Sequence, residues 1–140
     1  MNLLYPSWPD VNNSAAPVDR VSVNMRVGAI STQRAGGASI APYAAADGAG
    51  GFNLATHVGD DAVAVARNRA ALRQLLPAEP CWLNQVHGTA VFHARADTVY
   101  LNPPSADACI ATEPGVVCAV MTADCLPVLL CDFFGRVVGA

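Results

Sequence analysis

Two apolar runs in the C-terminal third of the chain constrain its fold more than any other feature. Nearly every residue from Val116 to Thr122 is apolar, and a second run extends from Pro127 to Cys131. Apolar runs of this length between turn residues are typical of strands buried on both faces of a sheet. Another apolar segment follows the turn at Asp132–Gly135 and reaches Ala140. We expect it to be a strand of a longer protein that continues beyond Ala140.

Further elements follow from hydrophobic spacing. Alternation from Val21 to Ala29 predicts a half-buried strand. A helix is expected at about 61–76, with its N-cap in Gly59-Asp60-Asp61 and its stop at Pro77. Its apolar face should contain Val63, Val65, Ala66, Ala70, Leu72, Leu75 and Leu76, and its solvated face Arg67, Arg69 and Arg73. Short strands are expected at Cys81–His87, Val91–Ala94 and Asp107–Ala111.

The stretch from Arg34 to Gly51 contains five glycines and seven alanines. Regular structure across Gly36-Gly37 would be costly, so the composition predicts a loop, either a tolerated insertion or an active-site lid. Together the elements predict one domain over residues 1–140, with an irregular lead-in over residues 1–20. The predicted class is α+β, with a mixed sheet and flanking helices.

Composition excludes several classes of protein. Hydrophobic residues make up 53% and charged residues 14%, the opposite of a disordered chain. With a net charge of −3 and no basic cluster, a nucleic-acid partner is not expected. No apolar run reaches the roughly 18 residues of a membrane span, and the N-terminus lacks a secretory signal. A cytoplasmic location with reduced cysteines is therefore the default, and the oligomeric state stays open.

The three histidines and Cys125 are the residues to consider for a site. His93 fits a surface or edge position, and His57 fits either a turn or a pocket. His87 follows a predicted strand and precedes Gly88, where side chains reach the rim of a sheet. Imidazole and thiolate ligands suit zinc, and copper less well here, so His87 and Cys125 are candidate metal ligands. Asp124 is a candidate partner or proton acceptor beside Cys125. The spacing alone supports the site only weakly.

Several strings together resemble the YfiH family, also called DUF152, the laccase-like or peptidoglycan-editing-factor family. The order and spacing of the strings fit from about residue 22 to residue 140. The strings are Ser31-Thr32-Gln33-Arg34-Ala35-Gly36-Gly37, Phe52–Asp61, Asn68-Arg69, Trp82–Gly88, Ala106-Asp107-Ala108 and Val120–Leu130.

The resemblance implies a YfiH-like domain of which this chain is a little more than half. It implies a zinc site with His87 and Cys125 as two ligands, and a third ligand from a histidine motif beyond Ala140. The implied activity is purine nucleoside phosphorylase and adenosine deaminase chemistry, with a purine nucleoside and phosphate as small-molecule substrates. His87, Cys125 and Asp124 would then be catalytic.

Three residues are candidate substrate contacts. Arg34 is the candidate for the phosphate, and Asn53 and His57 for polar groups of the nucleoside. For each of them, a role in loop structure is an alternative of at least equal weight.

Other functions remain open. In a peptidoglycan-precursor amide hydrolase, Cys125 could act as nucleophile with His87 as base. Phenol oxidation ranks last, because one Cys and few histidines cannot hold several copper ions. A truncated, non-catalytic fragment could instead pair an open edge strand with a partner.

Overall fold

A computed structural model of the chain describes residues 1, 3–5, 27–98, 100 and 102–140. They divide into two compact units. Unit 1 contains Met1–Tyr5 and Ile30–Pro80, and unit 2 contains Cys81–Ala140 with residues 27–29. The predicted lead-in and most of the predicted strand at Val21–Ala29 lie outside the described residues. Residues 27–29 belong to no strand.

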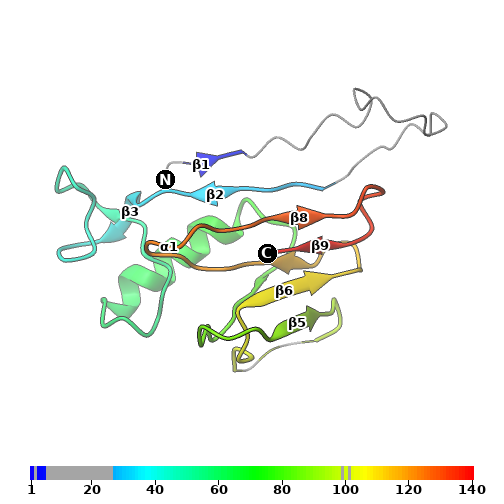
Figure 1. Cartoon of the computed structure of the whole chain (residues 1–140). Coiled ribbons are helices and arrows are strands. Elements are labelled where there is room, and N and C mark those ends of the chain that lie inside the picture. Colours follow the sequence, from blue (N-terminus) through cyan, green and yellow to red (C-terminus); the bar gives the residue numbers. More distant parts are fainter. Residues whose placement is uncertain (2, 6–26, 99, 101) are drawn as a thin grey trace. The chain divides into compact units, whose positions relative to one another are not determined.

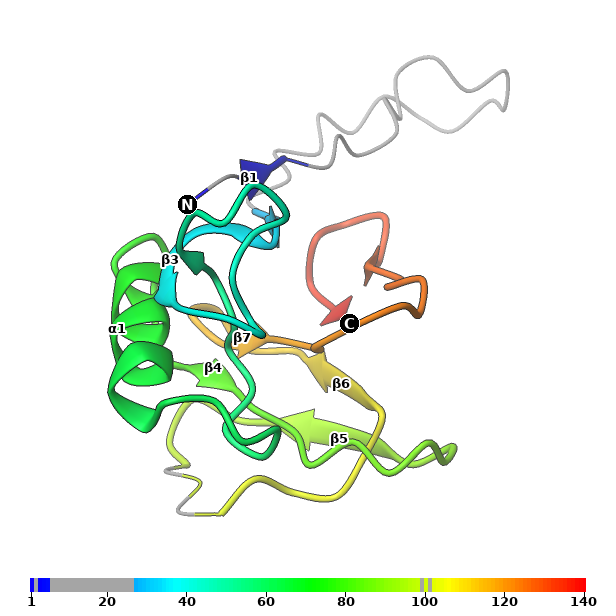
Figure 2. The ribbon, with the colours of Figure 1, turned by 90° about the vertical axis from the view of Figure 1, so that its left-hand side faces the viewer.

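Unit 1 combines short strands with the α1 helix. Strands β1 (Leu3–Leu4) and β2 (Ser31–Thr32) pair antiparallel, with Leu3 opposite Thr32. The third strand, β3 (Ala35–Ser39), packs along α1 (Ala62–Arg73), as Figures 1 and 2 show. Buried residues of the unit lie on the strand and the helix, at Ser39, Ala64, Val65, Asn68 and Leu72, and also between them in the sequence, at Ala45 and Phe52.

The predicted helix is confirmed, with ends slightly inside the expected range. Asp61 is its N-cap, and its carboxylate accepts hydrogen bonds from the N–H groups of Val63 and Ala64 at 3.3 and 3.1 Å. The helix ends at Arg73, before the expected stop at Pro77. Leu75 and Leu76 close tighter turns onto the carbonyls of Leu72 and Arg73.

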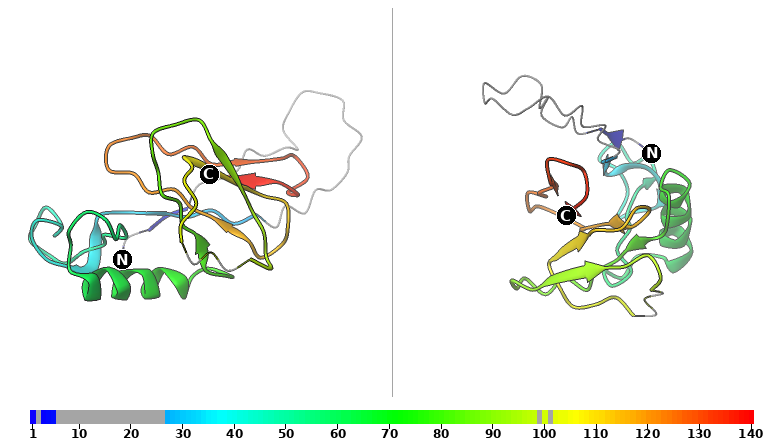
Figure 3. Two further views of the ribbon diagram at one scale, coloured as in Figure 1. Left: turned by 90° about the horizontal axis from the view of Figure 1, so that it is seen from below. Right: turned by 90° about the vertical axis from the view of Figure 1, so that its right-hand side faces the viewer.

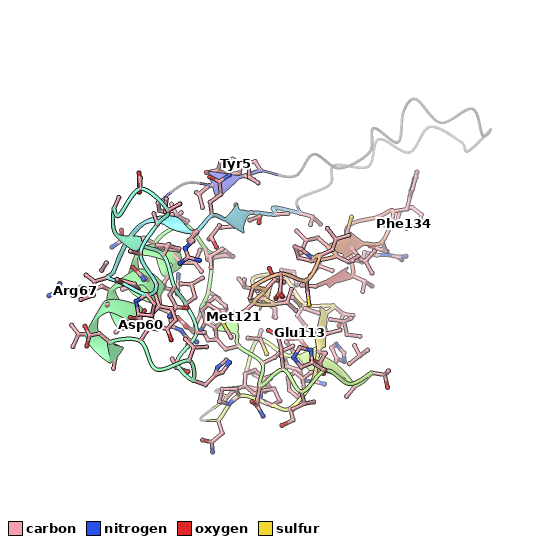
Figure 4. All side chains as sticks on the ribbon, turned by 60° about the vertical axis from the view of Figure 1, so that its left-hand side comes forward. Tyr5, Asp60, Arg67, Glu113, Met121 and Phe134 are labelled. Carbon is pink, nitrogen blue, oxygen red and sulfur yellow. The ribbon has the colours of Figure 1, made fainter. Side chains whose placement is uncertain are left out.

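The predicted buried face of α1 is only partly right. Its buried residues are Ala64, Val65, Asn68 and Leu72, whereas Val63, Ala66 and Ala70 are exposed. Alanines occupy several faces of this helix, so its apolar pattern is weak. The buried polar side chain of Asn68 determines which face turns inward. Arg67 points to solvent as expected (Figure 4). Arg69 is only partly exposed and donates to the Leu54 carbonyl at 2.8 Å.

The glycine-rich stretch is not simply a loop, because β3 passes through Gly36 and Gly37. The N–H groups of Gly36 and Gly37 both donate to the Gly50 carbonyl, at 2.9 and 3.1 Å. A Cβ on Gly37 would lie 2.2 Å from the Gly51 carbonyl oxygen, and one on Gly50 would lie 2.0 Å from the Gly37 oxygen. These glycines therefore permit two backbone segments to approach closely. A prediction from the loop preference of glycine alone does not reveal this role.

Unit 2 contains a four-stranded mixed sheet in the order β5-β6-β9-β8. β5 (Val91–Ala94) and β6 (Ala108–Ala111) are parallel, and β6 pairs antiparallel with β9 (Val138–Gly139). β8 (Leu130–Cys131) and β9 form an antiparallel hairpin, drawn in orange and red in Figure 3. Phe134 projects from its turn (Figure 4). The structure thus confirms a mixed sheet.

The strand expected at Cys81–His87 is shorter than predicted. It forms β4 (Pro80–Cys81), which pairs with β7 (Val117–Cys118). Within the apolar run at Val116–Thr122, β7 is the part that forms a strand. The core of unit 2 is built from Cys81, Leu83, Ala94, Ala106 and Cys109.

The prediction that Pro127–Cys131 is buried on both faces is wrong. β8 lies at the edge of its sheet, and Val128 and Leu130 are 57% and 65% exposed. Within the described parts of the chain, no helix combines the length and the apolar character needed to cross a bilayer.

Candidate functional site

The Asn84–Gly88 segment lies beside residues 104–107, the stretch of chain that leads into β6. Asn84 receives a hydrogen bond from the Ala106 N–H at 3.2 Å and donates its own N–H to the Pro104 carbonyl at 2.9 Å. Its side chain also donates to the Ser105 hydroxyl at 3.1 Å. After these bonds the chain bends at His87 and Gly88, and both residues are exposed.

His87 adopts a conformation that is unusual for a residue with a side chain. Its φ is +57°, in the left-handed region, and it is the one described residue other than glycine with positive φ. The Asp107 carboxylate accepts the His87 N–H at 2.8 Å and the Gly88 N–H at 2.7 Å, one on each oxygen. The Gly88 N–H, assisted by that of His87, holds the pKa of Asp107 below its usual range.

Gln85 joins this segment to the one that leads to Cys125. Its side-chain amide donates to the Met121 carbonyl at 3.0 Å and accepts the Met121 N–H at 2.8 Å. The amide thus pairs with the backbone as a neighbouring strand would. It ties together, within unit 2, two segments that carry the candidate ligands.

Asp124 and Cys125 lie in a bend after Met121, and both are exposed. The exposure of Cys125 distinguishes it from Cys81 and Cys109, which are buried in the core. Burial raises the pKa of the Cys81 thiol to about 12, which keeps that thiol protonated and unreactive. Cys125 is therefore the cysteine of the described chain best placed to meet a ligand or reagent from solvent.

The described residues supply no complete metal site. No group of three or more His, Cys, Asp or Glu side chains among them could hold a metal ion. His87 and Cys125 are of the types that zinc prefers, and their side chains are open to solvent. A catalytic zinc normally has three protein ligands, so this part of the chain accounts for at most two of them.

The expected substrate contacts all lie in unit 1, whereas the candidate ligands lie in unit 2. Arg34 is exposed, and its Nε and Nη2 donate to the carbonyls of Ala44 and Pro42 at 2.8 and 2.9 Å. These bonds support its role in loop structure. They use two of its five N–H groups, so the others remain for an anion.

Asn53 has a clear structural role. Its side chain accepts the Ala55 N–H at 3.0 Å and donates to the Asp60 carboxylate at 2.9 Å. That bond, with one from Ser39, lowers the pKa of Asp60. His57 lies exposed in the turn between Asn53 and Asp60. The structure thus favours the structural alternative for Asn53 and leaves the His57 imidazole accessible to solvent.

A small cavity lies beside the start of α1, with a volume of about 160 Å³. Its lining residues are Thr56, Asp60, Ala62, Val65, Ala66 and Arg69. Cavities that bury a drug-sized ligand measure about 300–1,000 Å³, so this one is too small to enclose a nucleoside.

Two residues of the site escaped the sequence reasoning. Gln85 and Asp107 both occur in the strings that suggested a family, but no local pattern links Gln85 to Met121 or Asp107 to His87. Such partners become visible only when distant segments are brought together. The one hint in the sequence was Gln85 itself, a polar residue two positions before the candidate ligand His87.

Comparison with known proteins gives consistent results. A family model described as multi-copper polyphenol oxidoreductase laccase matches residues 28–140. The chain is 42% identical, over 98% of its length, to a Pseudomonas aeruginosa protein named purine nucleoside phosphorylase PA4543. It is 39% identical, over 99% of its length, to the Escherichia coli protein named purine nucleoside phosphorylase YfiH.

A solved structure shares the fold. The crystal structure of the Neisseria meningitidis protein NMB0706, described as DUF152, is similar with a TM-score of 0.74 and 39% sequence identity. The match covers 99% of this chain and 49% of that one. Likewise, the chain covers 47% of the Pseudomonas protein and 49% of the Escherichia protein. The chain therefore spans about half the length of the relatives it matches.

Proposed function

The chain belongs to the family described as multi-copper polyphenol oxidoreductase laccase, and from this membership we propose that it contributes to a purine nucleoside phosphorylase. The predicted YfiH resemblance is thus confirmed. One observation carries the proposal: relatives named purine nucleoside phosphorylase are 39–42% identical over 98–99% of the chain. The matched stretch covers nearly the whole chain, so it contains the segments that bear His87 and Cys125.

Phosphorolysis sets clear demands on a site. An oxygen of phosphate bonds to C1′ of the ribose while the bond from C1′ to the purine breaks, and the purine leaves with the electron pair. The site must position the phosphate and stabilise charge on the leaving base. In this proposal Arg34 contacts the phosphate, and His57 meets a polar group of the nucleoside. Asn53 shapes the turn that carries His57.

His87 and Cys125 would hold a zinc ion, together with at least one ligand from outside the described residues. A bound zinc supplies Lewis-acid chemistry and lowers the pKa of a bound water, which adenosine deamination requires. Asp124 is placed next to Cys125 in the chain and would accept a proton near the metal. Deamination is thus a second reaction proposed for the same site.

A direct assay tests the proposed activity. The protein, at the full length that its gene encodes, is incubated with inosine or adenosine, with and without phosphate. We expect phosphate-dependent release of free base with ribose 1-phosphate, loss of activity on treatment with a chelator, and recovery with zinc. Base release that needs no phosphate, or no release at all, would contradict phosphorylase activity. Amide hydrolysis that survives chelation would instead favour a Cys125 nucleophile with His87 as base.

The proposed phosphate contact gives a second prediction. We expect Arg34→Ala to raise the KM for phosphate at least about fivefold, because a guanidinium binds phosphate through paired N–H groups. Arg67→Ala, on the solvent side of α1, is the matched control and should leave the KM unchanged. If Arg34→Ala changes the KM less than fivefold but lowers the melting temperature, Arg34 serves only to hold residues 42–44.

A further inference from the structure

The backbone conformation of His87 needs support from its surroundings. A residue with a Cβ pays a steric penalty at positive φ, and outside glycine it persists there only where other contacts hold it. At φ +57°, His87 turns the chain sharply between Val86 and Gly88. A rotation back to negative φ would redirect the imidazole. The direction of the imidazole therefore depends on whatever holds this bend.

The contacts that hold the bend come from one side chain. Asp107 receives two successive N–H groups, from His87 and Gly88, on its two carboxylate oxygens. Adjacent N–H groups that converge on an anion form a small cradle, and charge-assisted bonds of this kind are stronger than neutral ones. The N–H groups converge in this way only while His87 remains in the left-handed conformation.

Asp107 is itself well anchored. It directly precedes β6, and its N–H donates to the Ala90 carbonyl at 3.2 Å. The neighbouring residue Ala106 is buried and bonds to Asn84. Both the start and the end of the Asn84–Ala90 segment are thus tied to the same short stretch of chain, and the carboxylate holds the middle.

We propose that Asp107 is a positioning residue for His87, whose carboxylate fixes the left-handed bend and thereby the direction of the imidazole. Its importance for catalysis rests on the proposed function, in which His87 binds the metal. The bend itself does not depend on that function. Asp107 would act through the backbone of His87 and touch neither metal nor substrate.

Nuclear magnetic resonance of the chain tests the proposal without any activity assay. In the unchanged protein, the amide protons of His87 and Gly88 should exchange slowly, and a strong cross-peak between HN and Hα of His87 should report the short distance between these two protons at positive φ. In Asp107→Ala both amides should exchange at least tenfold faster, and this His87 cross-peak should weaken. Asp107→Asn retains one acceptor oxygen and should protect only one of the two amides. Asp97→Asn, at an exposed aspartate of the same unit, is the matched control.

Zinc binding supplies the functional readout. Loss of a group that orients a metal ligand typically lowers metal affinity by about 10–100-fold. In the full-length protein, we expect Asp107→Ala to raise the dissociation constant for zinc by this factor. Asp97→Asn should leave that constant unchanged.

Two results would overturn the proposal. One is negative φ at His87 in the unchanged protein, a measurement that needs no variant to fold. The other is unaltered amide exchange and an unaltered HN–Hα cross-peak of His87 in Asp107→Ala. If the backbone effects appear but the unchanged full-length protein releases no purine base, the proposed function fails and the positioning role stands.

Discussion

Replacing Asn68 with alanine is expected to lower the free energy of unfolding by about 3–5 kcal/mol, because it leaves several buried polar groups without partners. Asn68 is 2% exposed. Its Oδ1 accepts the Ala38 N–H at 2.8 Å, and its Nδ2 lies within 3.2 Å of the Ser39 hydroxyl and the carbonyls of Gly51 and Asn53. One amide thus joins α1 to both sides of the glycine-rich stretch.

The expected loss of stability does not come from a change in helix propensity. Alanine has a higher helix propensity than asparagine, by about 0.7 kcal/mol at most, so the local effect acts in the opposite direction. Urea unfolding with an unchanged m value measures the difference. Asn68→Asp should be destabilising as well, since a carboxylate offers no N–H to the carbonyls of Gly51 and Asn53. Asn102→Ala, at an exposed asparagine, is the control. A loss below about 1 kcal/mol in Asn68→Ala would show that water replaces the amide.

Removal of either candidate ligand should have the largest effect on activity. Changes in groups that merely orient a metal ligand cost about 10–100-fold, so we expect His87→Ala and Cys125→Ala each to lower phosphorolysis by more than about 100-fold. Both side chains are exposed, so these variants should fold normally. Kinetics of the full-length protein, with its zinc content, provide the measurement.

The chain offers close controls for both variants. His93→Ala removes an exposed histidine on β5, and Cys131→Ala removes another free cysteine, on β8. A direct test of the shared ion uses iodoacetamide, which should alkylate Cys125 slowly when zinc is present and rapidly in its absence. In His87→Ala, zinc should no longer protect Cys125. Activity within tenfold of the unchanged protein in either ligand variant would refute the two-ligand site.

Local signals predicted the helix, the turns and several strands correctly. Asp61 identified the helix start because an N-cap acts within three residues of itself. The strands predicted at Val91–Ala94 and Asp107–Ala111 are present as β5, with the same bounds, and as β6, which begins one residue later at Ala108. Each of these features depends on neighbours in the sequence, which a single sequence displays directly.

The errors share a different physical cause. Residues Gly36 and Gly37 were expected to favour a loop, yet they form part of β3 because the backbone at Gly50 and Gly51 requires the space. The buried face of α1 follows from hydrogen bonds of Asn68 to segments far away in sequence. At the site, residue types and motifs singled out His87 and Cys125, but the supports at Gln85 and Asp107 depend on partners 36 and 20 residues away.

The glycine-rich stretch also has a consequence for how such a protein can vary. Its stem is closed by Gly36, Gly37 and Gly50, and Arg34 secures the carbonyls of Pro42 and Ala44. At its tip, a Cβ on Gly48 would meet no atom within 4 Å, although the φ of +80° at Gly48 favours glycine there. Insertions and deletions near the tip would leave the stem pairing intact, whereas a single added methyl at Gly37 would force the stem apart. This segment therefore combines a tip free to change in length with a base that is fixed in composition.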